Sequence, residues 1–506
     1  MRLARTLTAM SDALRNGRLR DYLGILVVGS GARMFGLVSQ FVVLLMLSRF
    51  LPKDSFGHLM VALGFYRLIG IALGVGGSLV LLFHVSRHPD DRHAEIKLQR
   101  FSALMTAIPA AAIALAAIFA AGPVTTALGK PSLGPWLQEM APFLVFTTLL
   151  IVATGALEGR SRVTASIFWG EAAPNAVRLV LLPLVAVLNL PDAFVAHVMT
   201  LSVVLPWLWL ARRMWDRSVR GWQRWSSWDW SYCGKFVAST LFANQLGAAD
   251  LVVAGLLLPA ATVADYAVAS RLAALFTFFQ LALLKRFAPR AGRLLAAQES
   301  AHDHAALVRE FDVCRRLTIA STALTVGAVL LLAPLLLPLL GNYGGARVLM
   351  VLLAIPAIVQ AFYATSDRLL IIAGQPNVAL FVTALSFALL ALTPFATVPW
   401  LGAAAIPAAM MLAAVLIGPI IIIRAWQLVH IRSIAWRDAA FMASGCVALA
   451  SAALADTNAN VVLACAVLGV IAAYYIVTVT SRAATDDYGD ESSPSLPLFA
   501  PDKASR

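Results

Sequence analysis

Four arginines lie inside long apolar segments of this chain, where a permanent charge is costly. They are Arg33, Arg67, Arg178 and Arg271. Each lies about nine to thirteen residues into its segment, which at about 1.5 Å per residue is close to the middle of a bilayer. A guanidinium keeps its proton and binds phosphate oxygens through two parallel hydrogen bonds. Residue type and depth therefore predict a positive chamber that binds a phosphate or a pyrophosphate.

Polar residues on the same predicted helix faces are expected to line this chamber, and they are Gln40, Asn175 and Glu171. In a competing interpretation, each arginine is neutralised by a buried acid or by carbonyls and only joins helices, and Glu171 is the acid placed to pair with Arg178. Only two acids, Glu171 and Asp250, lie clearly deep. Four arginines then leave an excess of positive charge, which favours the chamber.

Two roles stay open for Asp250. A carboxyl group at this depth is able to carry a proton or to ligate Na⁺ during transport, and it is equally suited to pair with one of the arginines. The chain has no GxxxxGK[ST] motif, so we expect transport to draw on an ion gradient or on the membrane potential. The four cysteines have no metal-ligand spacing, and we expect neither a metal nor a cofactor.

The elements that position these residues are predicted to be membrane-spanning helices. The chain has 506 residues, of which 60% are hydrophobic and 13% charged, and its mean hydropathy is +0.82. This composition is typical of an all-α polytopic membrane protein. Fourteen apolar segments are long enough to cross, near 22–48, 56–86, 99–121, 136–158, 165–189, 193–211, 233–258, 262–287, 316–340, 345–373, 377–396, 400–424, 437–455 and 459–480.

The distribution of cations orients these segments. With both termini inside, the outer loops hold only Arg49, Lys53, Lys130 and Arg347. The remaining cations outside the spans lie in the tails and the inner loops, as the positive-inside rule requires. This asymmetry accounts for the formal net charge of +13 without a nucleic-acid partner. The first apolar run lacks a cleavage site and is predicted to be a retained span.

A weak internal repeat divides the chain into two halves. FLPKDSFGHLMVALGFYRL (50–68) aligns with LLPAATVADYAVASRLAAL (257–275) at a shift of 207 residues, which pairs Pro52 with Pro259. Two pseudo-symmetric six-helix bundles are predicted, with two extra helices after them. The expected units are a basic tail 1–21, an N-lobe 22–211, a linker 212–232, a C-lobe 233–424, two further spans in 425–480, and an acidic disordered tail 481–506.

The linker between the halves is rich in tryptophan and arginine. WLWLARRMWDRSVRGWQRWSSWDW (207–230) holds seven of the twelve tryptophans. Trp215, Trp222 and Trp225 would fall on one face of a helix, which predicts an amphipathic cytoplasmic linker lying in the membrane interface. Its expected role is an aromatic anchor, with a regulatory or lipid-binding role as the alternative.

Three stretches resemble one family of membrane proteins. They are SRFLPKDSFG (48–57), DLVVAGLLLPAATVADYAVASRL (250–272) and LLGNYGGARVLMVL (339–352). The chain resembles the Wzx-like polysaccharide flippases of the MOP superfamily, relatives of the lipid II flippase and the MATE antiporters, over roughly residues 20–480. It departs from the family pattern in the first stretch, where Pro52 replaces the usual glycine.

The resemblance implies a transporter rather than an enzyme. Its function would be to move an undecaprenyl-pyrophosphate-linked oligosaccharide across the bacterial inner membrane by alternating access, coupled to H⁺ or Na⁺. Related flippases carry essential arginines in spans one, two and eight, similar in placement to Arg33, Arg67 and Arg271. The implied partners are membrane lipids and the polymerase and glycosyltransferases of the pathway. The alternatives are a lipid II flippase, a MATE-type antiporter, and, from another class, a membrane-embedded glycan polymerase or ligase.

Overall fold

The computed structural model describes residues 31–87, 91–160, 162–212, 216, 218–226, 230, 234, 248–296, 301–373, 375–429, 436–455 and 457–486. Within these ranges ten helical segments are long and apolar enough to cross a membrane, or eleven if the bent pair α13 and α14 is one span. The predicted all-α polytopic class is confirmed. Much of the predicted segment 233–258 lies outside the described residues.

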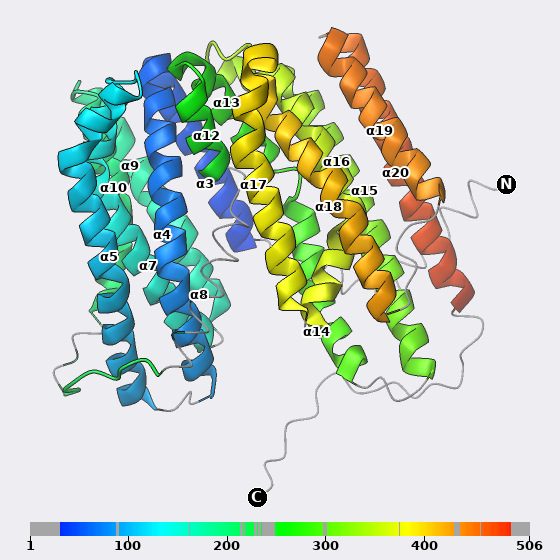
Figure 1. Ribbon diagram of the computed structural model, residues 1–506, viewed down its shortest axis with the longest axis horizontal. Coiled ribbons are helices and arrows are strands. Elements are labelled where there is room, and N and C mark those ends of the chain that lie inside the picture. The colour runs from blue at the N-terminus through cyan, green and yellow to red at the C-terminus, as the bar shows by residue number, and fades with distance from the viewer. Residues whose placement is uncertain are drawn as a thin grey trace, which may run out of the picture.

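The helices form two lobes, which Figure 1 shows side by side. The first lobe holds α3 (Gly31–Phe50), α4 (Lys53–Arg87), α5 (Arg92–Ala127), α6 (Leu133–Glu139), α7 (Ala141–Gly159), α8 (Val163–Ile167), a π-helical turn (Phe168–Ala172), α9 (Ala173–Val187) and α10 (Ala193–Ala211). The second holds α12 (Asp250–Leu257), α13 (Ala260–Ala273), α14 (Phe278–Ala296), α15 (Ala301–Leu340), α16 (Ala346–Ile372), α17 (Pro376–Leu401), a 3-10 turn (Gly402–Ala404) and α18 (Ala405–Val429). Helix α3 contacts both α9 and α15, so it lies between the lobes.

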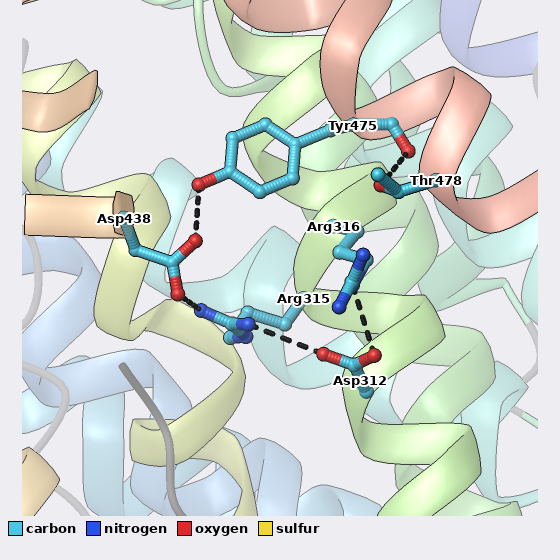
Figure 2. A network of polar contacts seen from close by, with 6 residues as sticks. All are labelled: Asp312, Arg315, Arg316, Asp438, Tyr475 and Thr478. Atoms are coloured by element: carbon cyan, nitrogen blue, oxygen red, sulfur yellow. Dashed lines mark hydrogen bonds and ion pairs between the residues drawn. The ribbon is translucent and has the colours of Figure 1, made fainter. Parts of the chain in front are cut away.

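Two further helices, α19 (Trp436–Ala455) and α20 (Asn458–Asp486), pack on the outer side of the second lobe. A buried polar network fixes them there (Figure 2). Arg315 Nη1 on α15 lies 2.7 Å from Asp438 Oδ2 on α19, and Tyr475 Oη on α20 donates to Asp438 Oδ1 at 2.5 Å. Arg315 also donates to Asp312 on its own helix at 3.1 Å. One carboxylate therefore joins three helices.

The two halves of the predicted repeat have corresponding helix starts. Helix α4 begins at Lys53, directly after Pro52, and α13 begins at Ala260, directly after Pro259. These starts differ by 207 positions (260 − 53), which is the shift of the sequence alignment. The two helix starts also pack together, because a Cβ on Gly57 would collide with the carbonyl of Ala260. We call this end of the molecule, with residues 48–58, 128–136, 255–265 and 338–347, the junction end.

The opposite end carries most of the loop cations and is called the basic end. It includes the described part of the linker, where the prediction of a helix is wrong: residues 218–226 are not helical. Trp222 is exposed and Trp225 is buried, so they do not share a face. Trp215 lies outside the described residues.

Candidate anion-binding site between the lobes

Arg67 lies in the middle of α4, fourteen residues after the first residue of the helix, which is about 21 Å along its axis. The preceding residue, Tyr66, is buried and donates to the carbonyl of Leu137, whereas the side chain of Arg67 is exposed. Arg67 interacts electrostatically with Glu171 in the first lobe and Asp250 in the second. An exposed side chain with partners in both lobes faces the space between them.

Arg178 is held on α9 by uncharged groups. Its Nε donates to Ser202 Oγ at 2.9 Å, and its Nη1 donates to Asn175 Oδ1 at 3.1 Å. Asn175 in turn donates to the carbonyl of Gly36 on α3 at 3.4 Å. These contacts orient the guanidinium without neutralising it. The expected pairing with Glu171 is not among the described hydrogen bonds and ion pairs of Arg178, and Glu171 interacts with Arg67 instead.

Arg271 comes from α13 in the second lobe and is half-buried. It interacts electrostatically with Arg67 and Arg178 of the first lobe and with Asp250 of its own lobe. Asp250, the first residue of α12, is fully buried and accepts a hydrogen bond from Tyr266 Oη at 2.9 Å. Tyr266 lies on α13 between the start of that helix and Arg271, so one helix positions both the carboxyl group and the arginine.

These five ionisable groups form one electrostatic cluster. Three arginines against two carboxylates, Glu171 and Asp250, leave an excess of one positive charge when all are ionised. Two of the arginines come from the first lobe and one from the second. Such a cluster holds an anion with several oxygens more readily than a cation, because guanidinium groups donate in pairs to phosphate oxygens.

Two predicted site residues, Arg33 and Gln40, lie on α3. Arg33 lies in the first turn of the helix, and its side chain lies outside the described residues. Gln40 is half-buried and lies seven residues further along, close to the same helix face. Within the described residues, no group of three or more metal-ligating side chains is present.

Above the cluster, cations of the first lobe close the junction end. Lys53 Nζ lies 2.9 Å from Asp265 of the second lobe. Lys130 Nζ donates to the carbonyls of Gly255 and Leu258, both at 2.5 Å, where α12 ends. Arg49 donates to the carbonyls of Leu339 at 2.7 Å and Pro338 at 2.9 Å, where α15 ends. Cations at helix C-termini satisfy orphan carbonyls and the helix dipole.

Burial changes the acid–base properties of this closure. It lowers the pKa of Lys130, and together with the nearby Asp265 it raises the pKa of Tyr343 to about 12. Tyr343 therefore stays protonated and donates to the carbonyl of Ser48 at 3.2 Å. A cavity of about 700 Å³ lies beside Lys130 and is lined from both lobes, by residues that include His58, Trp136 and Pro259. These contacts join the two lobes at the junction end.

Sequence reasoning did not assign the partners Ser202 and Tyr266 or the closing contacts of Arg49, Lys53 and Lys130. A signal was present for the three cations. The predicted outer loops hold only four basic residues. Because the positive-inside rule disfavours cations in outer loops, each of these four is a candidate for a specific role.

Comparisons with known proteins give the fold a name. The sequence matches no family model and no curated protein. Among solved structures, an inward-facing multidrug resistance MATE transporter of the MOP superfamily matches with a TM-score of 0.62 at 16% identity, covering 78% of this chain and 95% of that one. The chain has the fold of MOP superfamily transporters. Together with its apolar helices, this fold makes it a multi-pass membrane protein.

Two further solved structures have a similar fold. The lipid II flippase MurJ, in an inward closed conformation, matches with a TM-score of 0.64 at 10% identity, over 91% of this chain and 99% of that one. A MOP superfamily transporter from Pyrococcus furiosus, described with a binding pocket of reverse polarity, matches at 0.58 and 15% identity, over 79% and 95%. At these identities the likeness establishes the fold, and the Wzx-like resemblance stays a prediction.

Proposed function

We propose that this chain is a flippase that moves an undecaprenyl-pyrophosphate-linked oligosaccharide across the bacterial inner membrane, with both termini in the cytoplasm. The observation that carries the proposal is the interaction of Arg67 and Arg178 with Arg271 across the lobes, in the middle of the spans. A diphosphate supplies several oxygens at close spacing and two or more negative charges. It would replace repulsion between the guanidinium groups with hydrogen bonds to them.

In the proposed mechanism, the conformation of this structure receives the lipid-linked substrate from the cytoplasm. The closing contacts of Lys53, Lys130 and Arg49 lie at the junction end, and the positive-inside rule assigns the basic end to the cytoplasm. In this mechanism the head group enters from the basic end and the diphosphate binds the arginines, while the polyprenyl tail stays in lipid. Breaking the junction contacts then exposes the head group on the other side.

Asp250 links this binding to an ion gradient in the proposed mechanism. Its carboxylate competes with the diphosphate for Arg67 and Arg271, because it interacts with both arginines. Binding of H⁺ or Na⁺ to Asp250 would weaken that competition, and release would restore it. The alternative role, a permanent structural partner of the arginines, requires no change of Asp250 during the cycle.

The excess positive charge favours this proposal over a MATE-type antiporter for cations, which the cluster would repel. A lipid II flippase would use the same diphosphate chemistry, so it remains the alternative within this class. A glycan polymerase or ligase would need catalytic groups outside the membrane, and the connections at the junction end are short. Glycosyltransferases and a polymerase are the proposed pathway partners.

The test is binding of undecaprenyl pyrophosphate to the purified protein in nanodiscs, with Arg67→Gln, Arg271→Gln and Arg271→Lys. Loss of one charged hydrogen-bonding group should weaken binding by about 10- to 100-fold. Arg271→Lys should recover only part, because an ammonium does not bind two oxygens in parallel. Arg424→Gln on α18, an exposed cation at the basic end, is the control. Unchanged affinity in both glutamine variants would overturn the proposal.

A further inference from the structure

A non-helical strap lies against the first lobe at the basic end, at a place in the sequence between the two lobes. It comprises residues 218–226, which come after α10 and contain two arginines, Arg220 and Arg224. At Gly221 the backbone has a positive φ of 87°, a conformation that favours glycine and interrupts any helix. The strap is therefore shaped by its contacts with the first lobe rather than by helical hydrogen bonds.

Helix α5 holds the strap through three hydrogen bonds and the residue Asp216 before it through a fourth. Arg100 donates to the carbonyl of Val219 at 2.7 Å and to that of Asp216, just before the strap, at 3.0 Å. The N–H of Gln223 donates to the carbonyl of Lys97 at 3.4 Å. Trp225 Nε1 donates to the buried hydroxyl of Ser102 at 3.0 Å. The strap thus follows the first three turns of α5.

These contacts divide the strap into two sides. Val219 and Trp225 are buried against the lobe, and Gln223 is half-buried. The residues that alternate with them, Arg220, Trp222 and Arg224, are all exposed, and Trp222 keeps 58% of its surface. Asp216, just before the strap, accepts a hydrogen bond from Ser218 Oγ at 2.7 Å and lies 3.5 Å from Arg92. We call Arg220, Trp222 and Arg224 the outer row.

The depth of the outer row follows from α5. Arg100 is the last charged residue of this helix, and the 27 residues from Phe101 to Ala127 extend over about 40 Å, enough to cross the hydrocarbon thickness of about 30 Å. Ser102, the partner of Trp225, is the second residue of this uncharged run, at its basic-end edge. Lys97 and Arg100, which hold the rest of the strap, lie within the head-group layer. The outer row is exposed at that level.

We propose that the outer row binds the head groups of anionic phospholipids in the leaflet at the basic end. Tryptophan prefers this interfacial depth, and arginines beside it attract anionic lipid phosphates. The level of the row favours lipid over an acidic protein, which would approach from the water. Because the strap is bonded to α5, a bound lipid fixes the first lobe in the interface and leaves the second free to move.

The test uses the full chain in detergent with added lipids, and native mass spectrometry to count bound phosphatidylglycerol or phosphatidylcholine. We expect a preference for phosphatidylglycerol that falls about fivefold for each arginine lost in Arg220→Gln and Arg224→Gln. The matched control is Arg293→Gln with Arg424→Gln, two exposed cations with the same charge change. An equal loss of the preference in the control pair would mean that the preference comes from general surface charge rather than from a local site, and would overturn the proposal.

A second measurement identifies the occupant in native membranes. A photo-crosslinking amino acid at position 222 should give adducts with phospholipid, and the same amino acid at Val219, which is buried, should not. Adducts with an acidic protein in place of lipid would also overturn the proposal. Binding of undecaprenyl pyrophosphate by the outer-row variants should stay at the wild-type level, which separates this site from the arginine cluster.

Discussion

Asp438 is a single carboxylate on which the attachment of two helices depends. It is 5% exposed and accepts from Arg315 on α15 and Tyr475 on α20 (Figure 2). Breaking a buried pair by removing one partner leaves an uncompensated charge and costs about 3–5 kcal/mol. We expect Asp438→Asn to lower the free energy of unfolding by this amount, measured by denaturant unfolding in detergent.

The control for this prediction is Glu310→Gln on α15. Glu310 lies 3.3 Å from Arg290, but the two side chains are 20% and 35% exposed. Water screens such a pair, which is worth about 0–1 kcal/mol. If Asp438→Asn costs no more than Glu310→Gln, the network in Figure 2 does not fix α19 and α20.

Residue type and depth were enough to predict that arginines such as Arg67, Arg178 and Arg271 are unusual. A charged residue in the middle of an apolar run needs no structure to be noticed. The hydrogen-bond partners in this site could not be predicted from the sequence. The bonds of Arg178 to Ser202 and of Tyr266 to Asp250 join residues on different helices, and which faces meet depends on how each helix is rotated about its axis. A single sequence does not fix that rotation.

At the scale of the element, the contact of α4 with α13 depends on Gly57. A Cβ at this position would collide with the backbone carbonyl of Ala260, which cannot move as a flexible side chain can. We therefore expect Gly57→Ala to separate the helix starts and weaken the closed junction. Double electron–electron resonance between spin labels on the two lobes should show a longer distance at the junction end.

Gly344→Ala is the matched control, because an added Cβ there meets no atom within 4 Å. It lies at the same end, has the same change in composition, and should leave the distance distribution unchanged. Equal distributions for Gly57→Ala and the unchanged protein would mean that the lobes tolerate the extra methyl group and that the contact does not set their separation.

The linker shows where reading elements from a pattern fails. The spacing of Trp215, Trp222 and Trp225 fits one face of a helix, but the described residues 218–226 are bonded to α5 instead. Arg100 and Lys97, which supply the partners, lie more than a hundred positions away. A competing set of hydrogen bonds from a distant helix is invisible to a pattern within the segment itself.

For the whole molecule, the repeat was the most informative part of the sequence. A shift of 207 positions predicted two bundles of the same orientation, and the starts of α4 and α13 obey that shift. The state of the molecule was not predictable, because every conformation in an alternating cycle has the same sequence. Contacts such as those of Lys53, Lys130 and Arg49 show that the junction end is closed.

This closed junction leads to a prediction about the transport cycle. Lys53 Nζ and Asp265 Oδ1 are 2.9 Å apart and belong to different lobes. Lys53→Cys with Asp265→Cys therefore places two thiols where a short bis-methanethiosulfonate joins them through disulfide bonds, which a reductant cleaves. We expect cross-linking to stop flipping of a fluorescent polyprenyl-pyrophosphate lipid in proteoliposomes and reduction to restore it. Binding of undecaprenyl pyrophosphate should persist, because in the proposed mechanism the head group enters from the basic end. The uncross-linked double variant is the control, and flipping at an unchanged rate by the cross-linked protein would mean that the lobes do not separate at this end.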